Sequence, residues 1–365
     1  MKLPMHVVIV GPGALGLGLI GSLAGQAGLE MSLLARHGSD AKPDIVKRHL
    51  QRRGQYVVLA ERFHQTVSGF QLYWSDVNAS SERLLGNLAS LHADILICTT
   101  LGPAQGIGAK FINDLMRRRS TRTPGIVIVC PCENTVADSL ASIHHAFRES
   151  KHLLYADAMV DRFCKRPIVG RRGIVSVPVG DEYEWAISLR HNSHVAASNM
   201  ARVIDNLKKL DVSILSDVSN TKERKTLMCN GVHFCSALLA MPLGHTNLAS
   251  FFATPAGRDA VESLTVEFAK VWSYLQPKES PARIHGLQDW YLRRMLKNDH
   301  DVEVVLRNLT AGRPADFVRD TLNKVETAFQ VLLDNDREAA RNSMMLRALM
   351  FAAERHQHML SKIEE

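Results

Sequence analysis

The chain has 365 residues, of which 46% are hydrophobic and 22% charged, and its formal net charge is +7. This length favours two domains, and the composition is that of an ordinary soluble protein. No apolar run is long enough to cross a bilayer, the first one reads as a strand rather than a signal peptide, and the cysteines show no disulfide framework. We therefore expect a cytoplasmic protein with reduced thiols and no membrane partner.

The basic residues are dispersed along the chain and no aromatic platform accompanies them, which argues against a nucleic-acid partner. A mild positive field would instead attract an anionic cofactor or a phosphorylated small molecule. A metal site at Cys130 and Cys132, with His144 and His145 downstream, is conceivable. The spacing of known zinc sites is missing, so we expect buried thiols and no metal.

A glycine-rich turn follows the first predicted strand, residues 5–10. It reads Gly11-Pro12-Gly13-Ala14-Leu15-Gly16, and a helical run follows it. A G-x-G-x-x-G turn after a strand permits close approach of the backbone to a pyrophosphate and close packing of the helix. With a second strand predicted at 31–34, the pattern indicates a dinucleotide-binding βαβ unit. The alternative is a glycine turn without a ligand.

The end of the second strand indicates which dinucleotide is bound. NAD-binding folds usually carry an acidic residue there, which accepts hydrogen bonds from the ribose 2′-hydroxyl. This chain has Ala35 and Arg36 instead. Because a guanidinium can pair with the 2′-phosphate, we expect NADP, with NAD possible. The alternative is a surface arginine beside a pocket that accepts NAD.

Strands and helices alternate through the first 195 residues. Continuous apolar runs at 93–100 and 125–130 are typical of parallel strands buried on both faces, and 55–75 reads as a hairpin or extra strands. Further strands are predicted at 153–161 and 173–179, and helices at 82–91, 104–119 and 136–148. We predict an α/β fold with a Rossmann-like doubly wound sheet over 1–195.

From residue 196 to 365 the pattern is almost wholly helical. This part is predicted to be a helical substrate and catalytic domain. Its expected helices cover 196–210, 222–241, 258–275, 281–297, 315–334 and 337–363.

Polar residues follow two of the predicted strands. Ligands of open α/β sheets bind beyond the carboxyl ends of strands, so we expect Thr99, Thr100, Leu101 and Glu133 to lie near the cofactor. Asn134 follows Glu133 at the start of a predicted helix. Its amide N–H can stabilise negative charge on a carbonyl oxygen. Capping of that helix is the alternative role.

Lys225, Asn230 and His233 interrupt an otherwise apolar stretch. On an ideal helix, Asn230 lies about 140° and His233 about 80° round from Lys225, so all three share one side. A lysine at the start of a buried helix is costly unless it is paired, and it is a usable general base. The alternative is an exposed Lys225 in the first turn, with Asn230 and His233 satisfied in the core.

The pattern Lys225-x₄-Asn230-x₂-His233 resembles the polyol-specific long-chain dehydrogenases, and most closely their mannitol-1-phosphate type. Residues 99–103, 132–134 and 159–162 match in the same order, and the resemblance runs from Gly11 to about Asp334. It implies a zinc-independent hydride transfer between the nicotinamide and a secondary alcohol. In this family Lys225 would be the general acid and base.

The same resemblance implies roles for several polar side chains. Asn134 and Asn230 would hold the substrate oxygen, and His233 would hydrogen-bond the reacting end of the substrate. Asp161, Arg162 and Arg307 would lie near the substrate, which is a polyol or sugar, with a phosphate expected. The chain departs from the family at Ala35-Arg36 and around 301–307, where the match is loose.

Two other functions remain open. Ketopantoate reductases also begin with a Gly-x-Gly-Ala-Leu-Gly turn, use NADP and carry a Lys and an Asn in a helical second domain. The spacing here and His233 fit the polyol family better. The other alternative is a non-catalytic NADP-binding protein, which gives no reason for Lys225, Asn230, His233 and Asn134 to occur together. We expect a monomer or a homodimer.

Overall fold

The computed structural model describes residues 3–37, 44–101, 105–132, 150–190, 194–297, 302, 305 and 315–352. The chain forms two compact units, Met1–Ser219 and Asn220–Glu365. None of the helices in the described ranges is both long and apolar enough to span a membrane.

Six parallel strands form the centre of the first unit. Their spatial order is β5-β2-β1-β6-β7-β8. Numbered along the chain, this is the order 3-2-1-4-5-6 of dinucleotide-binding folds, in which the ligand crevice lies where the order reverses, here between β1 and β6. The expected Rossmann-like fold is confirmed. The strands are β1 (Met5–Val10), β2 (Glu30–Ala35), β5 (Phe70–Trp74), β6 (Asp94–Thr99), β7 (Val127–Pro131) and β8 (Leu153–Cys164).

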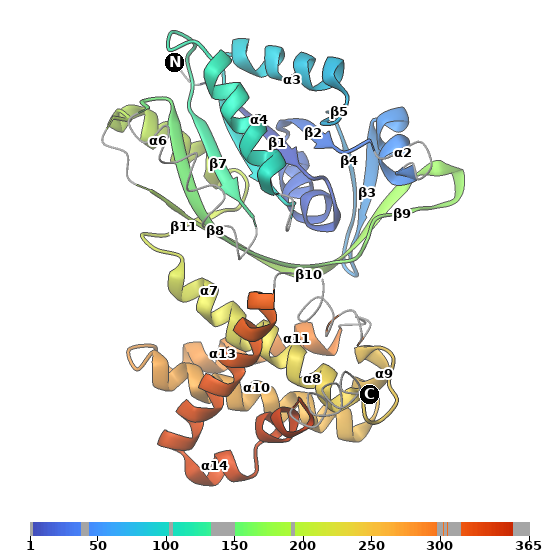
Figure 1. Cartoon of the computed structure of the whole chain (residues 1–365), viewed down its shortest axis with the longest axis vertical. Coiled ribbons are helices and arrows are strands. Elements are labelled where there is room, and N and C mark those ends of the chain that lie inside the picture. The colour runs from blue at the N-terminus through green and yellow to red at the C-terminus, as the bar shows by residue number, and fades with distance from the viewer. Residues whose placement is uncertain are drawn as a thin grey trace, which may run out of the picture. The chain divides into compact units, whose positions relative to one another are not determined.

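Helices cover both faces of this sheet, which explains why most residues of its strands are apolar. On one face, α3 (Asn78–Ser90) and α4 (Gln105–Arg118) lie side by side, as Figure 1 shows, and bury side chains such as Leu85 and Ile112. On the other face lie a π-helical turn, η1 (Gly16–Gly21), and the helix α1 (Ser22–Gln26).

A long curved strand, β10 (Val175–Leu189), extends the sheet beyond β8 (Figure 1). The expected hairpin at 55–75 is present as β3 and β4, and it pairs with β10. The hydroxyl of Ser22 donates to Oε1 of Gln65 at 2.6 Å, so the hairpin packs against α1. The other elements are β3 (Gln55–Leu59), β4 (His64–Ser68), β9 (Ile168–Val169), β11 (Ser213–Ile214), η3 (Arg171–Gly173) and α2 (Ile45–Arg53).

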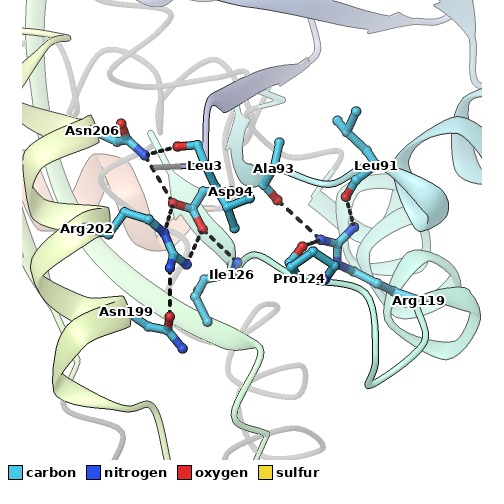
Figure 2. Close-up of polar contacts among 10 residues, drawn as sticks. All are labelled: Leu3, Leu91, Ala93, Asp94, Arg119, Pro124, Ile126, Asn199, Arg202 and Asn206. Carbon is cyan, nitrogen blue, oxygen red and sulfur yellow. Dashed lines mark hydrogen bonds and ion pairs between the residues drawn. The ribbon is translucent and has the colours of Figure 1, made fainter. Parts of the chain in front are cut away.

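A buried carboxylate fixes the helix α6 (Ala197–Lys208) to the first unit (Figure 2). Asp94 is 0% exposed and receives Nε of Arg202 at 3.0 Å and Nη2 at 2.9 Å. The Asn206 amide donates both to Asp94 and to the carbonyl of Leu3. The backbone N–H of Ile126 completes the cluster at 2.9 Å. Four donors satisfy this charge, as a buried carboxylate requires.

The boundary between the units therefore differs from the expected division after residue 195. The apolar side of α6, with Val203 and Leu207, belongs to the core of the sheet. The helical pattern at 196–210 does not indicate which unit the helix packs on. The structural boundary falls after Ser219.

The second unit is helical, as expected. One continuous helical stretch begins with α7 and passes through a second π-helical turn, η4, into α8. The elements are α7 (Ser219–Lys225), η4 (Thr226–Gly231), α8 (Val232–Ala240), α9 (Leu248–Phe252), α10 (Pro255–Leu275), α11 (Pro281–Leu296), α13 (Ala315–Asn335) and α14 (Arg337–Arg341).

The single helix expected at 337–363 is wrong in its first part. The helix α14 ends at Arg341, and a new helix begins at Met344. Glu267 accepts hydrogen bonds from the N–H groups of Met344 and Met345, and the hydroxyl of Ser343 accepts from Leu346. These acceptors satisfy the first turn of the new helix and so permit the break.

Two short helices were missed and one prediction lies outside the described residues. The helix α2 is strongly charged and fully buries only Leu50, so it lacks the usual apolar stripe; Asp44 caps its start at 3.0 Å. The helix α9 is too short to show periodicity. The helix expected at 136–148 falls within 133–149, outside the described residues.

Candidate functional site

The glycine turn lies at the carboxyl end of β1, where the strand order reverses. Gly11 has a φ of +86°, and its N–H donates to the carbonyl of Leu34 at 2.9 Å. A Cβ on Gly11 would lie 2.6 Å from the Leu101 side chain, and one on Gly16 would lie 2.9 Å from Ile9. Glycine is therefore required at the first and third positions for the backbone conformation and for close packing.

The middle glycine is different, because its surroundings are open. Gly13 is exposed, and the nearest described atom to a Cβ placed there is the Gly11 carbonyl oxygen at 3.9 Å. The fold itself therefore does not demand glycine at this position. A diphosphate approaching the backbone does demand it, so the turn has the shape that a dinucleotide needs. Ala14 and Leu15, which begin the helix, are half-buried beside it.

The end of β6 is joined to the glycine turn. Thr100 donates its N–H to the carbonyl of Val10 at 2.9 Å, and its hydroxyl donates to the Gly11 carbonyl. Leu101 packs on Gly11, whereas Thr99 is fully buried. The structure thus brings Thr100 and Leu101 to the glycine turn, and it leaves Thr99 inside the sheet.

One basic and one acidic residue follow the neighbouring strands β2 and β5: Arg36 comes after β2 and Asp76 after β5. Ala35 is buried and Arg36 is exposed. The N–H of His37 donates to Oδ1 of Asp76 at 2.7 Å, and the His37 ring meets Trp74 edge-on. Sequence reasoning missed Asp76, since it follows β5 and becomes a neighbour only through the pairing of β2 with β5.

Two side chains hold the π-helical turn η1. The Tyr56 hydroxyl donates to the Leu17 carbonyl at 3.0 Å, and Nη1 of Arg162 donates to the Gly18 carbonyl at 2.7 Å. Burial raises the pKa of Tyr56, so its hydroxyl keeps the proton that it donates. Arg162 is 7% exposed and its Nε also donates to the Gly180 carbonyl. These contacts give Arg162 a structural role, beside its predicted role near the substrate.

The stretch that carries Lys225, Asn230 and His233 has one partly open side. From Arg224 to Ala240, the half-buried residues are Lys225, Thr226, Asn230 and His233, and every other residue is buried. The Cys229 thiol lies 3.9 Å from Nδ1 of His233. Four polar side chains, those of Lys225, Thr226, Asn230 and His233, are thus partly exposed on a helix that is otherwise buried, and the Thr226 hydroxyl donates to the Lys222 carbonyl.

The π-helical turn brings them closer than an ideal helix would, so the expected angles need correction. In η4 the hydrogen bonds run from residue i to i+5, and Lys225 and Asn230 are five residues apart. A turn that absorbs one extra residue places His233 about 20° round from Lys225, instead of about 80°. The shared side was predicted from spacing, but the π-helical turn was not.

A glycine and a phenylalanine determine the packing of this turn. A Cβ on Gly231 would lie 2.7 Å from the ring of Phe268, which is on α10. Small size at Gly231 thus permits the wide turn to lie against α10. π-Helical turns inside α-helices occur frequently at functional sites.

The other predicted residues are only partly visible. Glu133, Asn134 and Arg307 lie outside the described residues. Asp161 is buried on β8, where it is paired in register with Glu184 of β10.

One group of possible metal ligands exists among the residues that the structure describes. The sulfur atoms of Cys98, Cys130 and Cys132 all lie within 4.8 Å of one another. Cys130 and Cys132 were considered as ligands at the sequence level and set aside. Cys98 was not connected with them, because only the pairing of β6 with β7 brings it there.

No protein-family model matches the chain. Its structure is similar to Pseudomonas fluorescens mannitol 2-dehydrogenase in a ternary complex with NAD and D-mannitol (TM-score 0.61, 14% identity, 99% of this chain and 95% of that chain covered). It is also similar to a D-sorbitol dehydrogenase (0.58, 13%, 91% and 81%) and to 2-dehydropantoate 2-reductase from Geobacter metallireducens GS-15 (0.51, 14%, 97% and 99%). At these identities the likeness shows the fold alone, a Rossmann-like unit followed by a helical one.

Proposed function

We propose that the chain is a zinc-independent oxidoreductase, which transfers a hydride between NADP(H) or NAD(H) and a secondary alcohol or ketone. The observation that carries this proposal is the single open side of the helix through η4. Lys225, Asn230 and His233 emerge there from an otherwise buried stretch. A merely structural helix has no need of a base, an amide and an imidazole on its one open side.

The glycine turn supports the cofactor part of the proposal. It follows β1 at the point where the strand order reverses, and Gly13 leaves room for a diphosphate. Bound nicotinamide would accept the hydride during oxidation and supply it during reduction. We propose a preference for NADP, because Arg36 can pair with a 2′-phosphate and Ala35 cannot accept from a 2′-hydroxyl.

The negative charge of Asp76 would act against the proposed preference for NADP. Its carboxylate receives the His37 N–H, one residue beyond Arg36. A carboxylate near the 2′ position would repel a phosphate and could accept from a hydroxyl. In our proposal the Arg36 charge outweighs that of Asp76.

The proposed chemistry moves one hydride and one proton. When the alcohol is oxidised, its carbon loses the hydride and its hydroxyl proton passes to neutral Lys225; in reduction, protonated Lys225 returns the proton to the oxygen. Asn230, with Asn134, would donate hydrogen bonds to the oxygen as negative charge develops on it. His233 would hydrogen-bond the reacting end of the substrate.

For the substrate we propose a polyol or sugar carrying a phosphate, such as the pair mannitol 1-phosphate and fructose 6-phosphate. The resemblance at Lys225-x₄-Asn230-x₂-His233 supports the polyol, and the formal net charge of +7 supports an anion. The proteins with a similar fold include a mannitol 2-dehydrogenase in complex with NAD and D-mannitol.

The test is a turnover screen of the full-length protein with a zinc chelator present. Fructose 6-phosphate, fructose and ketopantoate are each supplied with NADPH or NADH, and oxidation of the nucleotide is followed. We expect the highest kcat/KM for fructose 6-phosphate with NADPH. Turnover of ketopantoate alone would favour the ketopantoate-reductase alternative. Binding of NADPH without turnover of any substrate would favour a non-catalytic protein.

Asn230 and Asn220 form a matched pair for the oxyanion role. Asn230 is half-buried on the open side, and Asn220 is exposed on the first turn of α7. Asn230→Ala should lower kcat about 10²-fold, the scale of one oxyanion donor. Asn220→Ala should leave kcat unchanged. Equal kcat for the two variants would contradict the role of Asn230.

A further inference from the structure

Three cysteines meet on one face of the sheet in the first unit. Cys98 of β6 and Cys130 of β7 are direct neighbours in the parallel register. Cys132 lies two residues beyond Cys130, and its N–H donates to the Thr99 carbonyl at 2.9 Å. Alternation along a strand places Cys130 and Cys132 on the same face. All three side chains belong to the buried core that contains η1.

The spacing of the sulfur atoms suits a metal ion. The sulfurs of Cys130 and Cys132 are 4.0 Å apart, and all three lie within 4.8 Å of one another. If all three sulfur–sulfur distances were 4.0 Å, as between Cys130 and Cys132, an ion at the centre would lie about 2.3 Å from each sulfur. This is the length of a zinc–thiolate bond. The three sulfurs can therefore reach one ion with small movements.

We propose that Cys98, Cys130 and Cys132 bind a single Cu(I) ion. Thiolates select soft ions such as Cu(I) and Zn(II). Structural zinc almost always takes four protein ligands, and the group found among the described residues has three. Cu(I) accepts three sulfur ligands in a plane. The ion is neither oxidised nor reduced on binding.

Proton release accompanies binding of the ion. Two thiols lose their protons to solvent while the third stays neutral, so the buried complex carries one negative charge. Affinity should therefore fall as the pH is lowered, since protons compete with the ion.

The site is distinct from the proposed hydride transfer and its test uses no activity. The reduced full-length protein is titrated with Cu(I), without oxygen, against the chromophoric chelator bathocuproine disulfonate. We expect one Cu(I) per chain. Cys98→Ala and Cys132→Ala should each weaken binding at least about 10-fold. Cys235→Ala removes an equally buried cysteine of the second unit and should not weaken it.

Wild-type protein provides a second measurement, which does not depend on how the variants fold. X-ray absorption at the copper edge should report three sulfur neighbours. Bound Cu(I) should also raise the melting temperature by at least about 3 °C. Copper that is lost to the chelator, a neighbour shell of nitrogen or oxygen, or binding of Zn(II) in preference to Cu(I) would overturn the proposal.

Discussion

Two π-helical turns, η1 and η4, occur in the described parts of the chain, and different contacts hold them in place. In η1, polar side chains reach the backbone: the Tyr56 hydroxyl and the Arg162 guanidinium donate to the carbonyls of Leu17 and Gly18. In η4, the ring of Phe268 lies against Gly231, the Thr226 hydroxyl donates to the Lys222 carbonyl at 2.9 Å, and the Asn230 side chain is only half-buried.

The difference teaches what each turn does. All six residues of η1 are buried, and the hydrogen bonds from Tyr56 and Arg162 fix its backbone against the sheet. The η4 turn packs against α10 through Gly231 and Phe268, and Lys225, Asn230 and His233, at and after this turn, are half-buried. We therefore infer that η1 supports the glycine turn and that η4 positions the proposed catalytic side chains of Lys225, Asn230 and His233.

Lys225→Ala should have the largest effect, because it removes the proposed acid and base from the η4 side. The value of kcat should fall at least about 10²-fold. Lys222→Ala is the matched control: Lys222 is also half-buried, one turn earlier, and should keep the wild-type kcat. Steady-state kinetics between pH 6 and 10 measure both. A near-normal kcat for folded Lys225→Ala would show that Lys225 is not the acid and base, and that η4 has only a structural role.

Arg36→Ala, at the end of β2, should weaken NADPH binding by about 1.5–3 kcal/mol and leave NADH binding almost unchanged. Asp76→Asn should act in the opposite direction and strengthen NADPH binding. Fluorescence titration of both nucleotides measures these effects. NADH binding as tight as NADPH binding in the wild type would refute the preference.

Gly13→Ala should change NADPH binding without changing the stability of the fold. A Cβ at Gly13 meets ordinary contacts in the protein, so the melting temperature should stay within about 2 °C of wild type. A bound diphosphate would meet the methyl group, and NADPH binding should weaken by about 1–3 kcal/mol. Gly86→Ala, in open space on α3, should preserve both properties. Unchanged NADPH binding by Gly13→Ala would show that no diphosphate approaches this turn.

Tyr56→Phe should have the smallest effect, a loss of about 1 kcal/mol in the free energy of unfolding. The variant leaves the Leu17 carbonyl without this donor. Hydrogen exchange should accelerate at the amides of η1, while η4 serves as the internal control. Equal acceleration in both turns would mean that Tyr56 supports the molecule generally rather than η1.

Local sequence was enough to predict the strands of the sheet. The apolar runs at 93–100 and 125–130 became β6 and β7, because strands covered on both faces carry a continuous signal. The glycine turn was also predictable, because the spacing of its glycines directly after a strand is a local sequence pattern. The packing partner of α6 was not readable, because Asp94 and Arg202 are 108 residues apart in sequence.

The candidate site was predictable only in its composition. The spacing of Lys225, Asn230 and His233 indicated a shared side, but a π-helical turn depends on the fit of Gly231 to Phe268, on another helix. Arg162 shows the same limit: the family resemblance placed it near the substrate, and only the structure shows that it also donates to the Gly18 and Gly180 carbonyls. Long-range packing decides such roles.

One paired measurement tests most directly whether the glycine turn next to η1 binds the nucleotide and the residues around η4 carry out the reaction. The dissociation constant of NADPH and the single-turnover rate of its oxidation are determined for wild type, Gly13→Ala and Lys225→Ala. We predict that Lys225→Ala keeps the wild-type dissociation constant and loses at least about 10²-fold in rate. Gly13→Ala should lose affinity and, at saturating NADPH, keep most of the rate. Loss of NADPH affinity in Lys225→Ala with an unchanged rate at saturation would contradict the account.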